Sequence, residues 1–170
     1  QKTAYEIRNC DWSSDVCSSD LFTSMRDLTQ LERTHYESQL HAERLDAVFE
    51  GAGTAMVLLD SRGNILRCNS AVENLLGYSR DELIGMHHSS LSFPDDISDT
   101  SRLMAELVNG DRREFTIVKR YVSKSGSIIW ARLVATTPSP EAPRESKVIV
   151  LSIVDISEER EREAAAMRLS

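Results

Sequence analysis

Few side chains in this sequence are spaced for metal chemistry. Cys10 and Cys17 are separated by six residues, and no second pair of ligands follows at zinc-finger spacing. A structural zinc site needs four ligands, so these cysteines predict no zinc site. His87 and His88 are adjacent in a polar stretch, where imidazole groups are usually solvated or hydrogen-bonded to nearby backbone. We therefore predict no metal site.

Catalytic motifs are also missing from the sequence. His35 and His41 lack the acidic and basic neighbours of a phosphoacceptor histidine, and no Asn- or Gly-rich ATP-binding motif follows them. There is no Gly-Gly-Asp-Glu-Phe run and no phosphate-binding P-loop. We therefore expect a non-catalytic fragment, with any effector domain of the parent protein lying beyond Ser170.

The chain is acidic and contains no membrane-spanning stretch. Its 170 residues carry a net charge of -7, which argues against binding to nucleic acid or to an anionic membrane surface. No run approaches the roughly 20 consecutive apolar residues of a membrane helix, and the first residues lack the layout of a signal peptide. We expect one domain with helical or disordered flanks in a cytoplasmic protein.

The first 21 residues differ in character from the rest of the chain. Residues 11–21 read D-W-S-S-D-V-C-S-S-D-L, with neither helical nor strand period. Written back into codons, residues 1–7 and 11–21 resemble the two parts of a sequencing-library adapter in one reading frame, with room for an index between them. We interpret residues 1–21 as a translated adapter and expect them to be disordered. Cys68 is then the only native cysteine, which fits a reduced compartment.

Residues 22–50 predict one long helix. There is no Gly or Pro between residues 23 and 50, and Thr23 or Ser24 could cap the helix. Its apolar positions form a thin stripe among charged residues: Leu28, Leu31, Leu40 and Leu45. Because a helix with so narrow a stripe is seldom stable alone, we expect a coiled coil that joins two copies in a homodimer.

The remaining sequence alternates between strand and helix patterns. Strands are expected where apolar residues alternate or run together between turn signals, at residues 54–60, 65–69, 114–123, 127–137 and 147–154. Helices are expected where apolar residues recur at three-to-four spacing or caps are present, at residues 70–76, 80–84, 94–108 and 155–169. This order predicts an α+β domain, an antiparallel sheet with helices on one side.

Local residues mark the ends of these elements. Asn69 and Ser70 suit the passage from the second strand into a helix, because their side chains can bond to nearby backbone. Gly77 is expected to end that helix, where a positive φ is needed.

Several phrases in this order resemble the PAS domain family across residues 45–157. They are L-L-D-S-R-G-N-I-L-R-C-N-S-A, L-L-G-Y-S-R-D-E-L-I-G, F-P-D-D, G-S-I-I-W-A-R-L and D-I-S-E-E-R. The resemblance implies a five-stranded antiparallel sheet in the order 2-1-5-4-3, flanked by N- and C-terminal signalling helices. It also implies a small pocket between the sheet and its helices.

The resemblance also assigns roles to residues at the end of the last strand. Asp155 corresponds to the Asp of the family's D-I-T motif, and Ser157 replaces the usual Thr while keeping a hydroxyl. In the family this junction couples the sheet to the exit helix, so we predict signal transmission through Asp155, Ile156, Ser157 and Trp130. The alternative is ordinary capping and packing.

Neither a flavin nor a haem is favoured by the residues that the family would use. A flavin photosensor would show Asn-Cys-Arg-Phe near residues 85–96, which here read G-M-H-H-S-S-L-S-F-P-D-D without a cysteine. Cys68 lies earlier and is expected to be a small buried hydrophobe. A haem ligand would come from the helix at residues 96–108, which has no histidine. The cofactor is therefore unknown, and a small apolar ligand is the expected occupant.

These patterns predict a sensory PAS module from a bacterial signal-transduction protein. We expect it to bind a small ligand or to dimerise, and to relay a signal through residues 155–170, the interrupted start of a linker helix. The effector would be a histidine kinase of a two-component phosphorelay or a cyclic-dinucleotide enzyme. One alternative is a constitutive dimerisation spacer without ligand, and another is a haem-binding redox or gas sensor.

Overall fold

The computed structural model describes residues 15–169, with side chains from Arg26 onward. The chain divides into two units, Gln1–Ala47 and Val48–Ser170, and each is described by itself. Predictions that concern residues 1–14 lie outside the described residues.

The described part of the N-terminal unit is helical. Helix α2 spans Asp15–Gly51, so it begins before the predicted caps at Thr23 and Ser24 and inside the segment that we expected to be disordered. No Gly or Pro interrupts the chain between Asp15 and Glu50, and side chains of moderate propensity can continue a helix that is already nucleated. The adapter interpretation concerns the origin of the segment and stays a prediction.

Three of the four leucines of the predicted apolar stripe of α2 are solvent-exposed in the single chain, whereas Leu40 is half-buried and lies outside the heptad positions that the other three share. Leu28, Leu31 and Leu45 have exposed fractions of 59%, 68% and 68%. These three residues fall on the a and d positions of one heptad frame, which places them on one side of the helix.

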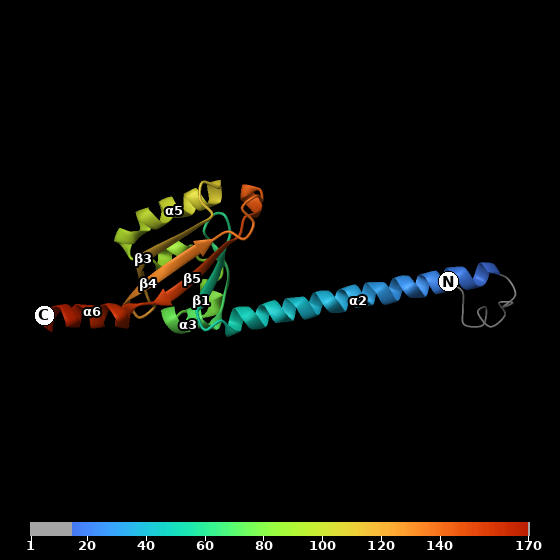
Figure 1. The fold of residues 1–170 in the computed structure, drawn as a ribbon, viewed down its shortest axis with the longest axis horizontal. Helices are drawn as coiled ribbons and strands as arrows, with labels where there is room; N and C mark the ends of the chain where they lie inside the picture. The colour runs from blue at the N-terminus through green and yellow to red at the C-terminus, as the bar shows by residue number, and fades with distance from the viewer. Residues whose placement is uncertain (1–14, 170) are drawn as a thin grey trace. The chain divides into compact units, whose positions relative to one another are not determined.

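The C-terminal unit is built on a five-stranded antiparallel sheet (Figure 1). The strands are β1 (Ala55–Leu59), β2 (Ile65–Cys68), β3 (Glu114–Val122), β4 (Ile128–Thr136) and β5 (Ile149–Asp155). Their order is β2-β1-β5-β4-β3, with every neighbouring pair antiparallel. This confirms the predicted fold class and strand order.

Helices α3, α4 and α5 cover one face of this sheet (Figure 1). They span Ser70–Leu76, Arg80–Leu83 and Ile97–Asn109, and α6 follows β5 at Ser157–Leu169. The helix predicted from Pro94 starts as a short 3-10 turn, Pro94–Asp96, before α5 begins at Ile97.

The core lies between the sheet and these helices. In β1, β3, β4 and β5, alternate residues point inward, while the intervening residues of the outer face are partly or fully exposed. The innermost apolar side chains are Leu59, Ile65, Leu76, Leu83, Leu107, Leu133 and Ile149. Cys68 is also fully buried, as predicted, and burial raises the pKa of its thiol.

Asn69 is the most completely bonded polar residue of this core. Its Oδ1 accepts hydrogen bonds from the backbone N–H of Met56 at 3.0 Å and of Val72 at 3.3 Å, and its Nδ2 donates to the carbonyls of Phe49 and Thr54, both at 2.9 Å. The side chain is fully buried. The amide therefore joins the last residues of α2 to β1 and to the start of α3, which confirms and extends the predicted local bonding.

Candidate functional site

The first part of the candidate site is the junction where β5 passes into α6. The N–H of Ile156 donates to the carbonyl of Trp130 at 2.8 Å, and the N–H of Trp130 donates to Ser157 Oγ at 3.1 Å. Asp155 Oδ1 accepts from the N–H of Ser157 at 2.9 Å. The ladder between β4 and β5 thus continues one step into the helix, with the serine hydroxyl in place of a backbone acceptor.

The Trp130 ring also contacts the first turn of α6. The guanidinium carbon of Arg160 lies 3.9 Å from the ring centroid, and that of Arg120 lies 5.3 Å from it. Arg132 of β4 forms an ion pair with Glu159 at 3.8 Å. Trp130 is half-buried, and a cation over such an indole contributes on the order of 1 kcal/mol, so these contacts bias the helix direction without fixing it rigidly.

The structure brings together all four residues that the sequence singled out: Asp155, Ile156, Ser157 and Trp130. Ile156 is buried, and Asp155 caps the first N–H of the helix. Arg160 and Glu159 were missed, because a charged stretch such as E-E-R-E-R gives no sign of which members will contact the sheet.

The second part of the candidate site is a small cavity in the core. Its lining is mostly aliphatic, but it includes His88, Lys119 and Tyr121. The aliphatic and thioether members are Val57, Ile65, Leu76, Leu91, Met104, Leu133, Leu151 and Ile153. The volume open to the centre of a water molecule is only about 10 Å³, which is space for one water.

Lys119 places an amino group inside this cavity. The residue is 1% exposed, its Nζ donates to Ser92 Oγ at 2.6 Å, and Nζ lies 4.5 Å from the ring centroid of Tyr121. Burial lowers the pKa of Lys119 to about 8, opposed in part by Asp96. At neutral pH the cavity therefore contains a buried positive charge. The sequence analysis did not identify this residue.

His88 separates the core from a second, outer pocket. It is 8% exposed, and burial, followed by the charges of His87 and Lys119, lowers its pKa to about 4, so the ring is neutral at pH 7. The prediction of a solvated or locally bonded histidine is wrong for His88. It is confirmed for His87, whose Nε2 donates to the Arg62 carbonyl at 2.9 Å while Nδ1 accepts from the Ser89 N–H at 3.3 Å.

Gly63 makes room for this histidine pair. Its φ is +90°, and a Cβ at this position would lie 2.7 Å from Cδ2 of His88 and 2.8 Å from Nε2 of His87. Any larger residue would have to displace both rings.

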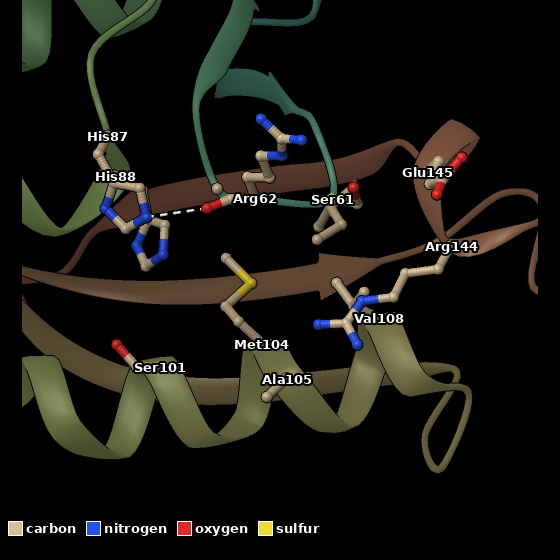
Figure 2. Close-up of a pocket in the computed structure, with 12 residues that line it drawn as sticks. Ser61, Arg62, His87, His88, Ser101, Met104, Ala105, Val108, Arg144 and Glu145 are labelled. Carbon is tan, nitrogen blue, oxygen red and sulfur yellow. Dashed lines mark hydrogen bonds between the residues drawn. The ribbon is translucent and has the colours of Figure 1, made fainter.

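The outer pocket lies between α5 and the segments of Arg62 and Arg144 and has a volume of about 490 Å³ (Figure 2). Met104 projects from α5 toward the segment that carries Arg62. His88 and Met104 line both the outer pocket and the core cavity. These two side chains therefore form the wall between the two spaces.

Residues 15–169 contain no group of three or more His, Cys, Asp or Glu side chains arranged to hold a metal ion. No helix within the same residues is both long and apolar enough to cross a bilayer.

The sheet order and the helices on one face define the class of α+β fold. The family model for the PAS fold matches residues 43–151. The chain belongs to the PAS family.

Two curated relatives of this chain are signalling proteins. It is 26% identical over 152 residues to the probable diguanylate cyclase DgcE of Escherichia coli, covering 89% of this chain and 13% of the relative. It is 26% identical over 140 residues to the sensor histidine kinase TmoS of Ectopseudomonas mendocina, covering 82% and 14%. The chain therefore spans about one seventh of the length of these curated relatives.

Solved structures show the same fold. A PAS domain from Colwellia psychrerythraea is 26% identical, with a TM-score of 0.60, and the match covers 70% of this chain and 98% of that one.

Proposed function

We propose that this chain is the sensory module of a larger signalling protein and that it relays changes in its PAS core through the junction between β5 and α6. The observation that carries the proposal is a pair of hydrogen bonds made by the backbone of Trp130. Its carbonyl accepts from the N–H of Ile156, and its N–H donates to Ser157 Oγ. The effector would be a histidine kinase or a diguanylate cyclase, as in the two relatives, and the module would act in the cytoplasm.

The junction has the properties that a relay requires. Trp130 pairs with Arg120 of β3 on one side and bonds to the start of α6 on the other. A shift of β4 relative to β5 would therefore change the geometry at Ser157 directly. Because none of the α6 residues in the described part of the helix is buried, few other contacts oppose its movement.

Substitution of Ser157 tests the relay. In a fusion of this chain to a histidine kinase, Ser157→Ala removes the acceptor of the Trp130 N–H, and we expect the kinase output to change about fivefold or more, the lower end of ordinary coupling free energies. Stability should fall by only about 1 kcal/mol, the contribution of one hydrogen bond. Autophosphorylation and chemical denaturation measure the two effects.

The matched control is Ser157→Thr, which keeps the hydroxyl and restores the residue usual in the family motif. It should leave both the kinase output and the unfolding midpoint close to wild type. If Ser157→Ala lowers the midpoint but the kinase output stays the same, the junction is only structural and the relay proposal is rejected.

We further propose a homodimer that forms through α2. Leu28, Leu31 and Leu45 are exposed on one side of this helix, as a parallel or antiparallel pair of helices would require. Replacing Leu28 and Leu31 with lysine should convert dimers to monomers in sedimentation equilibrium, whereas Gln30→Lys, outside the a and d positions, should not. A wild-type chain that is monomeric at high micromolar concentration contradicts this proposal.

The tight core favours a second candidate, a constitutive dimerisation spacer. A cavity of about 10 Å³ leaves no space for a ligand unless side chains move. The spacer and the sensor differ in whether any small molecule binds to the core.

A further inference from the structure

The positive charge of Lys119 has no anionic partner inside the core. A lysine ammonium has three N–H donors, and among the described residues the hydrogen bond to Ser92 Oγ is the one that Nζ makes. The residues that line the core cavity, all within the described part of the chain, include no Asp or Glu. Removing a charge from water without a counterion is costly.

The acidic side chain that acts on Lys119, Asp96, is already paired with Arg120. Asp96 Oδ2 accepts from the backbone N–H and Nε of Arg120 at 2.8 Å and 3.0 Å, and Oδ1 accepts from Nη2 at 2.8 Å. This paired arrangement holds the pKa of Asp96 below its usual range. Asp96 acts on Lys119 only as a distant charge. Besides Ser92 Oγ, Nζ contacts the ring of Tyr121, so the ammonium has neutral neighbours and no carboxylate partner.

We propose that the core cavity binds a short-chain monocarboxylate, whose carboxylate pairs with Lys119 while its alkyl group contacts the aliphatic lining. This inference rests on the proposed sensory function, for which it names the class of ligand. It also replaces the wholly apolar ligand expected from the sequence.

The surroundings of Nζ select this chemistry. Leu76, Leu133, Leu151 and Ile153 line the same cavity and suit an alkyl chain. The cavity of about 10 Å³ has room for one water, so even acetate would enter only if lining side chains such as Met104 move. Each further methylene needs a larger displacement, so acetate, propionate or butyrate suit the proposal better than a long fatty acid. A second charge on the ligand would have no partner, because Lys119 is the one charged side chain in the cavity lining of the described residues.

An entry route leads through the wall of His88 and Met104. Both side chains face the outer pocket as well as the core cavity. The unbranched Met104 side chain can change rotamer at little cost, and Figure 2 shows it between α5 and the opposite segment. Arg62 and Arg144 line the outer pocket together with one acid, Glu145, an excess of positive charge that favours anions.

The ligand would act on the strand that faces the junction. Lys119 pairs with Ala131 of β4, and the next pair in the register is Arg120 with Trp130. A carboxylate bound to Lys119 would therefore shift β3 at the residue next to Arg120, which pairs with Trp130. The inferred site and the proposed relay are thus adjacent in the same two strands.

Binding can be tested on the full chain without an effector. Melting curves are recorded for the wild type, Lys119→Met and Lys124→Met with sodium acetate, propionate or butyrate, and with sodium chloride at equal ionic strength. Lys124 is an exposed lysine that pairs with Glu82, so its variant controls for the loss of one positive charge. At least one carboxylate should raise the melting temperature of the wild type and of Lys124→Met saturably, by about 4 °C or more near 100 times its Kd.

The inference is overturned if no carboxylate produces a saturable shift, if chloride produces the same shift, or if Lys119→Met responds as the wild type does. If Lys119→Met does not fold, binding is tested instead by NMR on wild-type protein labelled with 13C at the methionine methyl groups. The Met104 signal should move on titration of the wild type, while that of the exposed Met167 should not, and an unmoved Met104 signal also overturns the inference. A negative binding result leaves the Ser157 experiment unaffected, so failure of the ligand class and failure of the relay are distinguishable.

Discussion

Replacing Asn69 with alanine is expected to lower the free energy of unfolding by about 3 kcal/mol or more. The amide bonds to four backbone groups, at Phe49, Thr54, Met56 and Val72. Each buried group left without a partner costs roughly 1–3 kcal/mol, although water entering the site would offset part of this cost. Urea denaturation followed by circular dichroism measures the change.

Two further variants test whether the loss of stability is specific to the Asn69 amide. Asn74→Ala, at an exposed position of the same short helix, should change stability by less than about 0.5 kcal/mol. Asn69→Asp keeps both acceptor oxygens but replaces the amide donor by a carboxylate facing the carbonyls of Phe49 and Thr54, so it should also destabilise. A loss below about 1 kcal/mol for Asn69→Ala would show that the network is not needed for the fold.

Lys119→Met is expected to stabilise the protein at neutral pH by up to about 3 kcal/mol. The pKa of Lys119 is lowered from 10.5 to about 8 in the folded state, and each unit corresponds to about 1.4 kcal/mol. Methionine fills a similar volume without a charge, and Ser92 keeps its bond to the carbonyl of His88 at 3.3 Å. The gain is the removal of a buried cation that lacks a carboxylate partner.

The lowered pKa of Lys119 determines how the stability difference between Lys119→Met and the wild type changes with pH. Between pH 8 and pH 10.5 the unfolded chain still binds the Lys119 proton and the folded chain releases it, so this residue makes wild-type stability rise with pH. The difference between Lys119→Met and the wild type should therefore be largest below pH 8 and shrink toward pH 10.5. Denaturation series at several pH values measure it, and a difference that stays constant across this window contradicts the burial of a charged lysine.

The parts of the fold that were predictable are those determined by local bonding and alternation. Asn69 follows a strand and precedes a helix, where its side chain reaches the nearby backbone whatever the distant packing. Gly77 ends α3 with a φ of 76°, as the turn required. The strand order followed from the family resemblance and not from periodicity, which says nothing about which strands are neighbours.

The parts that were not predictable depend on packing between distant segments. His88 lies in a polar stretch and becomes buried because Gly63, from another turn, leaves space for its ring. Lys119 had a usable signal: it occupies an inward position in the alternation of Phe115, Ile117 and Tyr121. A lysine at such a position is rare enough to indicate a site, although the strand pattern by itself does not distinguish it.

Because the first turn of α6 contacts the sheet, a small rotation of the helix there displaces its far end by a larger distance. Ser157, Glu159 and Arg160, all in the first turn, bond to or contact the sheet. The helix continues to Leu169 with no buried residue among those described, and at about 1.5 Å per residue it is roughly 20 Å long. A tilt of about 10° at the pivot would therefore displace the far end by about 3 Å, comparable to the length of one hydrogen bond. Shortening α6 would reduce this displacement in proportion, whereas removing the contacts of its first turn with the sheet would abolish it.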